Sequence, residues 1–252
     1  MTKIRAFSTI DSREKVCYDI SMKGIEMSKN KLGFTMAEVL ITLGVIGVVA
    51  AMTIPNVIKH YQQQETVAKL KKVYNIFSNA LQMSRLEHGD VETWEIGSLD
   101  NLQSSSDFAD EYIIPYIKIL KACKTNQTNE CSYSATNRQN QNIDFSKSTR
   151  LFLNDGTVIL LNIKRTSSLP KVVSIWFDIN GKKSPNKYGK DVFVFAIALD
   201  ATSDKFKPLG RLNASGQSQN ESDIKNNCIT KGNYCSAYIM RNSWKMPEDY
   251  PW

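Results

Sequence analysis

A long apolar run dominates the N-terminal part of the sequence. It extends from Phe34 to Ile58, and between residues 39 and 58 it contains no charged side chain. The polar residues in that interval are Thr42, Thr53 and Asn56. As a helix the run would be about 37 Å long at ~1.5 Å per residue, enough to cross a hydrocarbon core of ~30 Å. The pattern therefore predicts a membrane-spanning helix.

After Lys59 the pattern becomes that of an amphipathic helix. Apolar residues recur at alternating steps of three and four, namely Val67, Leu70, Tyr74, Phe77 and Leu81. We expect this helix to end near His88 and Gly89, because glycine is common just after a helix. A coiled-coil partner would use the same stripe. The stripe is short, however, and a domain follows that needs it, so we expect the helix to pack on that domain.

The rest of the sequence predicts a loop-rich region and then a sheet. Residues 90–149 contain one expected helix near Asp107–Lys121 and a polar stretch at residues 125–142. The expected strands are two runs within residues 150–162 around the turn Asp155-Gly156, then Lys171–Asp178 and Asp191–Leu199. These patterns predict an α+β fold in which an antiparallel sheet of about four strands packs on a long helix.

Composition changes this picture little. The chain has 252 residues, 42% of them apolar, which is typical of one or two folded domains. The formal net charge of +7 is too diffuse to indicate a nucleic-acid partner. Both histidines, His60 and His88, fall on the predicted helix, and no Ser/His/Asp arrangement, phosphate-binding loop or zinc signature is visible. We therefore do not expect an enzyme.

Four of the five cysteines fall into two local pairs, Cys123 with Cys131 and Cys228 with Cys235. Paired cysteines around short polar loops are typical of an oxidising compartment, outside the bacterial cytoplasm. Zinc is a competing interpretation, although neither pair has the usual C-x2–4-C spacing and no histidine lies nearby. Free buried thiols are a third. We favour disulfides, and we expect the second to close a hairpin around Lys231-Gly232-Asn233.

One acidic residue, Glu38, interrupts the start of the apolar run. A carboxylate in a spanning helix costs up to ~2.5–3.5 kcal/mol, so a plain membrane anchor does not explain it. A secretory signal peptide would be cut after the apolar stretch, whereas here the helical pattern continues past Ala50-Ala51. The basic residues just before Gly33 predict that the N-terminus stays in the cytoplasm and that the chain after Lys59 is exported.

The segment Lys31-Leu32-Gly33 followed by Phe34-Thr35-Met36-Ala37-Glu38 resembles the signal sequence of type IV prepilins and type II secretion pseudopilins. The resemblance implies that a prepilin peptidase cuts between Gly33 and Phe34 and N-methylates Phe34. It implies that Glu38 neutralises the N-terminal amine of a neighbouring subunit. Pro55 stands where the family often has a helix-disturbing proline.

The resemblance also bears on organisation. It divides the chain into a leader (1–33), a transmembrane and filament-core half-helix (34–59), an amphipathic half-helix (60–89), a connecting region (90–149) and a sheet with a disulfide-closed C-terminal region (150–252). A leader of 33 residues is long for the family. Translation from Met27, or from Met22, would give a compact leader without Cys17, and we expect such a start.

Residues 178–191 resemble a D-x-N-G…P-N…G-x-D-x-F segment of pilin-like proteins. Some pseudopilins hold calcium in a nearby loop, and Asp178, Asn180 and Asp191 would supply oxygen ligands here. The pattern is not an EF-hand, so we favour a structural turn at Asn180-Gly181 and expect no cofactor. The tail residues Trp244, Tyr250 and Trp252 form either a binding surface or, as we favour, an anchor for the terminus.

Taken together, the sequence and the resemblance predict a structural subunit of a type IV pilus or a type II secretion pseudopilus. The alternative is a minor pilin that binds a surface, secreted cargo or DNA. The expected partners are the prepilin peptidase, the membrane, other pilin or pseudopilin subunits and the inner-membrane assembly platform. The expected location is the bacterial inner membrane, with a single span, and then a periplasmic or extracellular filament.

Overall fold

The computed structural model describes residues 33–124, 130–166, 169–199, 206–210 and 219–252. Residues 1–32 of the expected leader, which include Met27 and Cys17, lie outside these residues. The chain divides into two compact units, residues 1–50 and 51–252, and each is described here by itself. Helix α1 (Met36–His88) begins in the first unit and provides the first element of the second.

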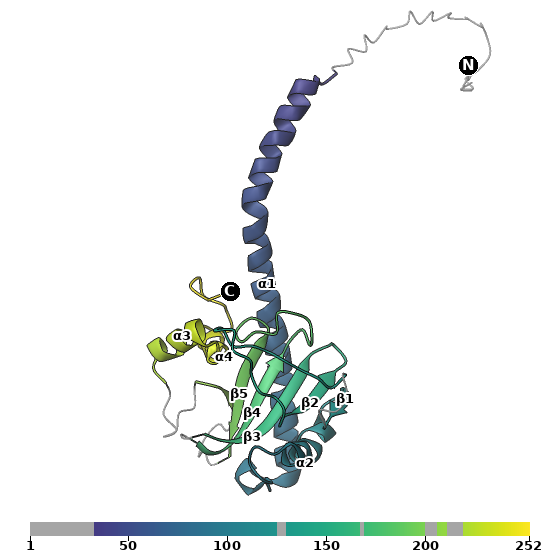
Figure 1. The fold of residues 1–252 in the computed structure, drawn as a ribbon, viewed down its shortest axis with the longest axis vertical. Helices are drawn as coiled ribbons and strands as arrows, with labels where there is room; N and C mark the ends of the chain where they lie inside the picture. Colours follow the sequence, from purple (N-terminus) through teal and green to yellow (C-terminus); the bar gives the residue numbers. More distant parts are fainter. Residues whose placement is uncertain (1–32, 125–129, 167–168, 200–205, 211–218) are drawn as a thin grey trace, which may run out of the picture. The chain divides into compact units, whose positions relative to one another are not determined.

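The second unit combines the C-terminal part of α1 with one sheet and several short helices (Figure 1). Its further helices are η1 (Val91–Thr93), α2 (Leu102–Tyr112), η2 (Ile114–Tyr116), α3 (Glu221–Thr230) and α4 (Cys235–Arg241). Its strands are β1 (Ile119–Cys123), β2 (Thr149–Leu153), β3 (Val158–Thr166), β4 (Leu169–Asp178), β5 (Val192–Ala198) and β6 (Phe206–Pro208). The strands form one antiparallel sheet in the order β1-β2-β3-β4-β5-β6.

The amphipathic part of α1 packs on one face of this sheet, as the spacing of its apolar residues predicts. Its buried residues are Thr66, Val67, Leu70, Val73, Phe77, Ala80, Leu81 and Ser84, while Tyr74 is half-buried. The Phe77 ring meets Phe177 of β4 at 5.5 Å and Phe206 of β6 at 5.0 Å. The helix ends at His88, and Gly89 follows with a φ of 76° that suits glycine.

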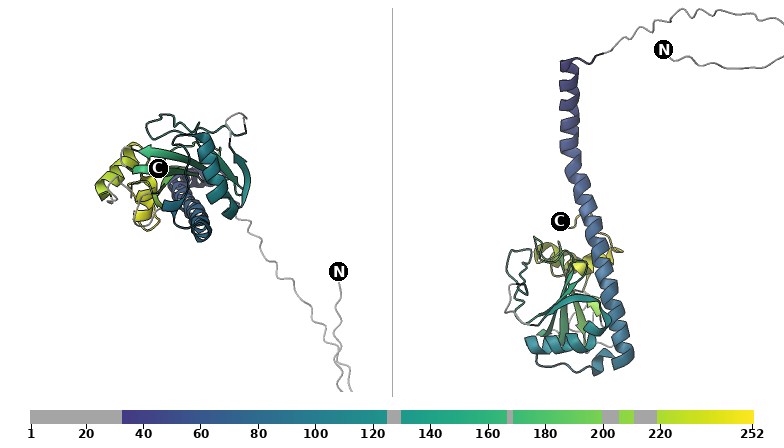
Figure 2. Two further views of the ribbon diagram at one scale, coloured as in Figure 1. Left: turned by 90° about the horizontal axis from the view of Figure 1, so that it is seen from below. Right: turned by 90° about the vertical axis from the view of Figure 1, so that its right-hand side faces the viewer.

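A second layer covers the opposite face of the sheet. Because side chains alternate along a strand, Trp176 of β4 points away from α1. It packs with Phe145 at 5.3 Å and donates a hydrogen bond to the Tyr188 hydroxyl at 2.6 Å. The covering segment, residues 131–148, and α1 lie on opposite sides of the sheet in the right-hand view of Figure 2. The sheet is therefore buried on both faces.

The predicted fold class is confirmed, with two differences of detail in the sheet region. Within the described residues the sheet has six strands rather than about four, because β1 and the three-residue β6 extend its two edges. The helix expected at Asp107–Lys121 is instead α2, which begins after the N-cap Asn101 and ends at Tyr112. Pro115 prevents the α-helix from continuing, since proline has no backbone N–H to donate to the carbonyl four residues earlier and its ring clashes with that carbonyl; the chain forms the short helix η2 there instead.

The expected hairpin in the tail is wrong. Cys228 and Cys235 lie on two consecutive helices, α3 and α4, rather than on two strands. Asn220 caps α3 by accepting the backbone N–H of Asp223 at 2.8 Å. Gly232, with a φ of 86°, ends that helix by donating its N–H to the Asn227 carbonyl at 2.8 Å.

Candidate functional site

The start of α1 carries the residues that the sequence assigns to cleavage and assembly. Gly33 and Phe34 precede the helix, and the Phe34 side chain is 87% exposed. A Cβ added at Gly33 would meet no atom within 4 Å. The Gly33–Phe34 peptide bond therefore lies in exposed, non-helical backbone, where a peptidase can reach it.

Thr35 and Glu38 form a capping box at the first turn of α1. The Thr35 hydroxyl accepts the backbone N–H of Glu38 at 3.2 Å, and Glu38 Oε2 accepts the backbone N–H of Thr35 at 2.8 Å. The Thr35 hydroxyl also donates to Glu38 Oε2 at 2.9 Å. Within the described chain, no basic side chain pairs with Glu38. The T-x-x-E spacing of Thr35 and Glu38 is the signal in the sequence that indicates this box.

The helix that follows is apolar around its whole circumference. Its most apolar 18-residue window has a mean hydropathy of 2.2 and no buried residue, so length and composition allow it to cross a membrane. Leu40 and Val57 are each 67% exposed. The helix continues through Pro55. Exposed apolar surface of this extent requires lipid or other apolar helices as its surroundings.

The four cysteines after Gly33 form two disulfides, Cys123–Cys131 and Cys228–Cys235. These are the two local pairs that the sequence spacing favours over zinc or free thiols. The first joins the edge strand β1 to the start of the outer layer, which is the segment of residues 131–148 that covers the sheet face opposite α1. The second joins α3 to α4.

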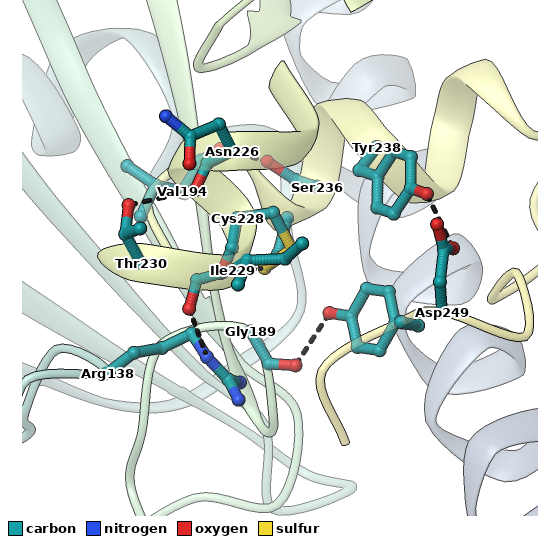
Figure 3. Close-up of a disulfide and its surroundings, with 12 residues drawn as sticks. Arg138, Gly189, Val194, Asn226, Cys228, Ile229, Thr230, Ser236, Tyr238 and Asp249 are labelled. Carbon is teal, nitrogen blue, oxygen red and sulfur yellow. Dashed lines mark hydrogen bonds between the residues drawn. A yellow bond between two sulfur atoms is a disulfide. The ribbon is translucent and has the colours of Figure 1, made fainter. Parts of the chain in front are cut away.

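The second disulfide lies where three separate segments meet (Figure 3). Arg138 of the outer layer donates from Nε to the Ile229 carbonyl at 3.2 Å. The Tyr250 hydroxyl donates to the Gly189 carbonyl at 2.6 Å, and Tyr250 is buried. The Arg138 bond holds α3 against the outer layer, and the Tyr250 bond holds the C-terminal segment against the connection between β4 and β5. Tyr250 thus anchors the C-terminal segment, as we favoured from the sequence.

The β4–β5 connection places Asp178 and Asp191 in buried positions. Asp178 accepts the Tyr133 hydroxyl at 2.8 Å, and burial raises the pKa of its carboxyl to about 7. Asp191 accepts the backbone N–H groups of Asn186 at 2.9 Å and Lys187 at 2.6 Å, and burial raises its pKa as well. The carboxylates thus organise the turn by accepting hydrogen bonds from the protein itself.

Other features of the β4–β5 connection bear on whether it could bind calcium. Gly181 has the positive φ of 72° that the turn requires, and Asn180 Nδ2 donates to Asp191 at 3.2 Å. The Oδ1 atoms of Asn180 and Asn186 are buried and accept no hydrogen bond. In the part of the chain that the structure describes, no group of three His, Cys, Asp or Glu side chains is arranged to hold a metal. The expectation of a structural turn without a cofactor, favoured over a calcium site, stays a prediction.

The fold and the N-terminal motif define a type IV pilin-like protein. A family model described as the prokaryotic N-terminal methylation motif matches residues 28–54. The motif implies processing by a prepilin peptidase and assembly with other pilin subunits in a membrane complex, and proteins of this class are structural. The motif and the apolar helix fit a membrane-anchored pilin.

The rest of the chain belongs to a narrower group. A second family model, described as a family of unknown function (DUF6613), matches residues 56–252, so the chain belongs to that family. No curated protein and no solved structure matches the chain significantly.

Proposed function

We propose that this protein is a structural subunit of a type IV pilus or a type II secretion pseudopilus. In this proposal the peptidase cuts after Gly33 and methylates Phe34, and the mature chain polymerises through its apolar N-terminal helix. The observation that carries the proposal is the combination of a fully exposed apolar helix with a single acid, Glu38, at its start. A helix that only spans a membrane needs the apolar surface, but the carboxylate of Glu38 makes its insertion less favourable.

Filament assembly would account for both the exposed apolar helix and the acid at its start. Parallel packing of the helices removes their apolar surface from water and from lipid. A carboxylate in that environment is costly when alone, and much less so beside the positively charged amine of a neighbouring Phe34. The pairing would fix the axial register of adjacent subunits. The membrane anchor before assembly and the filament core after it are then the same segment, residues 34–58.

The proposal also assigns topology. The basic residues before the cut stay in the cytoplasm, and the chain after Lys59 is exported. The two disulfides support this direction, because disulfides persist in oxidising compartments outside the cytoplasm.

Substitution of Glu38 tests the proposal. Glu38→Ala and Glu38→Gln should both leave cleavage and membrane insertion intact and abolish filaments, because neither side chain carries the charge that pairs with the amine. Mass spectrometry of the membrane fraction reads cleavage and methylation at Phe34, and electron microscopy of sheared filaments reads assembly. Normal filaments in Glu38→Ala would overturn the assembly role, and an unmethylated or uncut Phe34 in the wild type would overturn the processing step.

A minor pilin in the same filament is the second candidate. The observation that favours it is size: the mature chain would have 252 − 33 = 219 residues, and a whole segment of it, residues 131–148, is spent on covering the outer face of the sheet. The abundance of this chain in purified filaments separates the two roles. A dominant component is the bulk subunit, and a trace component is a minor pilin with a surface, secreted cargo or DNA as its partner.

A further inference from the structure

Charges of opposite sign are separated within the unit of residues 51–252. Residues 86–117 contain eight Asp and Glu and no Lys or Arg. Residues 179–190, most of the connection between β4 and β5, contain four Lys and no Asp or Glu. We call the first segment the acidic end and the second the lysine loop. Each segment therefore carries a clear excess of one sign of charge.

The carboxylates of the acidic end face the solvent. Glu95 and Glu111 are exposed, and both lie near Tyr112, whose hydroxyl accepts the backbone N–H of Glu95 at 3.1 Å. Burial raises the pKa of Tyr112, and the charges of the two carboxylates raise it further. Asp90 and Asp110 are paired with basic side chains from outside the segment, both at 2.5 Å. Among the described residues, Glu95 and Glu111 form no such ion pair.

The acidic end also offers an apolar contact. A hollow of about 530 Å³ lies there, lined by Gln82, Arg85, Leu86 and Asp90. Leu86 is 81% exposed. Exposed ion pairs contribute little one by one, whereas covering an exposed leucine removes apolar surface from water. A partner that matches the carboxylates and covers Leu86 would gain from both.

The lysine loop presents its charges outwards. Residues 182–185, which include two of its lysines, are all exposed. The ammonium groups of Lys187 and Lys190 lie against an amide oxygen at 2.7 Å and an aromatic ring at 5.9 Å, and not against a carboxylate. The acids that flank the loop, Asp178 and Asp191, are buried and accept hydrogen bonds within the protein. They do not balance the lysines at the surface.

The two segments lie at opposite ends of the sheet. The backbone N–H of Asp100, in the acidic end, donates to the Ile163 carbonyl of β3 at 2.8 Å. The lysine loop begins after Asp178, which pairs with Val158 at the other end of β3. Five residues of strand separate Val158 from Ile163, or roughly 17 Å at ~3.3 Å per residue. Helix α2 of the acidic end lies at the lower end of the sheet in Figure 1.

We propose that the lysine loop of one copy of this chain docks on the acidic end of a second copy. Charge complementarity carries the inference, and the separation of the two surfaces makes the contact head-to-tail. A contact of this kind joins different surfaces of the two copies, so it can repeat along a filament. The inference rests on the proposed function, and it adds a contact between folded units to the packing of the apolar helices.

Cross-linking with a carbodiimide, which couples an amine directly to a carboxylate, tests the proposal. Isotopically labelled and unlabelled full-length chains are mixed in detergent, and mass spectrometry identifies linked peptides that carry one label of each kind. Such links arise only between copies. We expect them to join residues 182–190 to residues 87–111. Raising the ionic strength from ~0.05 M to ~0.5 M should lower their yield several-fold, because exposed charges are then screened.

Two charge-reversed chains test whether the contact is head-to-tail. Lys183→Glu with Lys190→Glu cancels the charge of the lysine loop, and Glu95→Lys with Glu111→Lys halves that of the acidic end. Each doubly substituted chain alone should lose the links several-fold. A mixture of the two should recover them, because one chain keeps the acidic end and the other keeps the loop. Lys147→Glu, at an exposed position outside both surfaces, should leave the yield unchanged.

The wild-type chains decide the outcome even if a variant fails to fold. Links between copies that avoid either surface, or a yield that salt does not change, overturn the proposal. The result is also separable from the proposed function. Cells that form filaments of this chain, whose wild-type copies give no such links in detergent, keep the filament role and exclude the docking contact. Links in detergent without filaments in cells retain the contact and overturn the filament role.

Discussion

Replacement of Asp178 by asparagine should remove a large part of the pH dependence of folding stability near neutrality. Burial raises the pKa of this carboxyl to about 7, against an ordinary aspartate value of 3.8. At a pH between these two values Asp178 is protonated in the folded chain and ionised in the unfolded chain. Raising the pH across this interval therefore lowers the free energy of unfolding, and the loss is complete once the pH exceeds the folded value.

The magnitude follows from the size of the interval. Each pH unit over which the two states differ by one proton corresponds to ~1.4 kcal/mol. Because the folded carboxyl is already half ionised at pH 7, the step from pH 5 to pH 7 removes roughly 2.3 kcal/mol. For a domain of about 200 residues this corresponds to a fall in Tm of roughly 5–9 °C. The contribution of the nearby carboxyl Asp191, whose pKa is also raised, has the same sign.

Thermal unfolding of the detergent-solubilised chain, followed by near-ultraviolet circular dichroism from pH 5 to pH 8, measures the effect. Asparagine keeps an oxygen that can accept the Tyr133 hydroxyl but cannot ionise. In Asp178→Asn the fall in Tm should therefore shrink to the part that Asp191 contributes. An unchanged slope in the variant would refute the reasoning, because the titrating group would then lie elsewhere. Asp144→Asn is the matched control, since the pKa of that exposed carboxyl is lowered, chiefly by the backbone N–H of Ser146.

Three further predictions concern packing, backbone and metal. Phe77→Ala should cost ~3–5 kcal/mol in unfolding free energy, because the ring is fully buried between α1 and the sheet; a loss below ~1 kcal/mol in chemical unfolding would contradict the packing. Gly189→Ala should lower Tm more than Gly156→Ala, although both residues have a positive φ. A Cβ at Gly189 would lie 2.5 Å from Cys235 Sγ, whereas one at Gly156 would meet nothing within 4 Å. Equal falls in Tm would show that the cost comes from the backbone conformation alone. Addition of a chelator should leave Tm unchanged, because the carboxylates of the 178–191 connection already accept hydrogen bonds from the protein. A fall in Tm would establish a bound metal.

The long helix could be predicted in detail from the sequence. Its apolar residues keep a period close to 3.6 from Val67 to Leu81, and burial follows that period because one face packs on the sheet. The hairpin at Asp155-Gly156 was predicted equally well, since its two strands are apolar and its turn residues are specific.

The errors arose where short-range signals compete. Gly232 between two cysteines suggested a hairpin, but the N-cap Asn220 and the local hydrogen bond from Gly232 favour a helix, α3, before the glycine. The outer layer gave no periodic signal, because its apolar side chains, such as Tyr133 and Phe145, are isolated within a polar stretch. Their burial depends on long-range contacts with the sheet, which one segment of sequence does not encode. The Thr35–Glu38 capping box was readable from its spacing alone.

The spacing of the disulfides has a consequence for how the chain matures. Four cysteines allow three pairings, but each cysteine here pairs with a neighbour only 8 or 7 residues away. The second pair begins 228 − 131 = 97 residues after the first pair is complete. At synthesis rates of ~5–20 residues per second, that interval lasts roughly 5–20 s. If oxidation keeps pace with export, Cys123 and Cys131 meet before Cys228 exists, so the order of emergence itself excludes the wrong pairings.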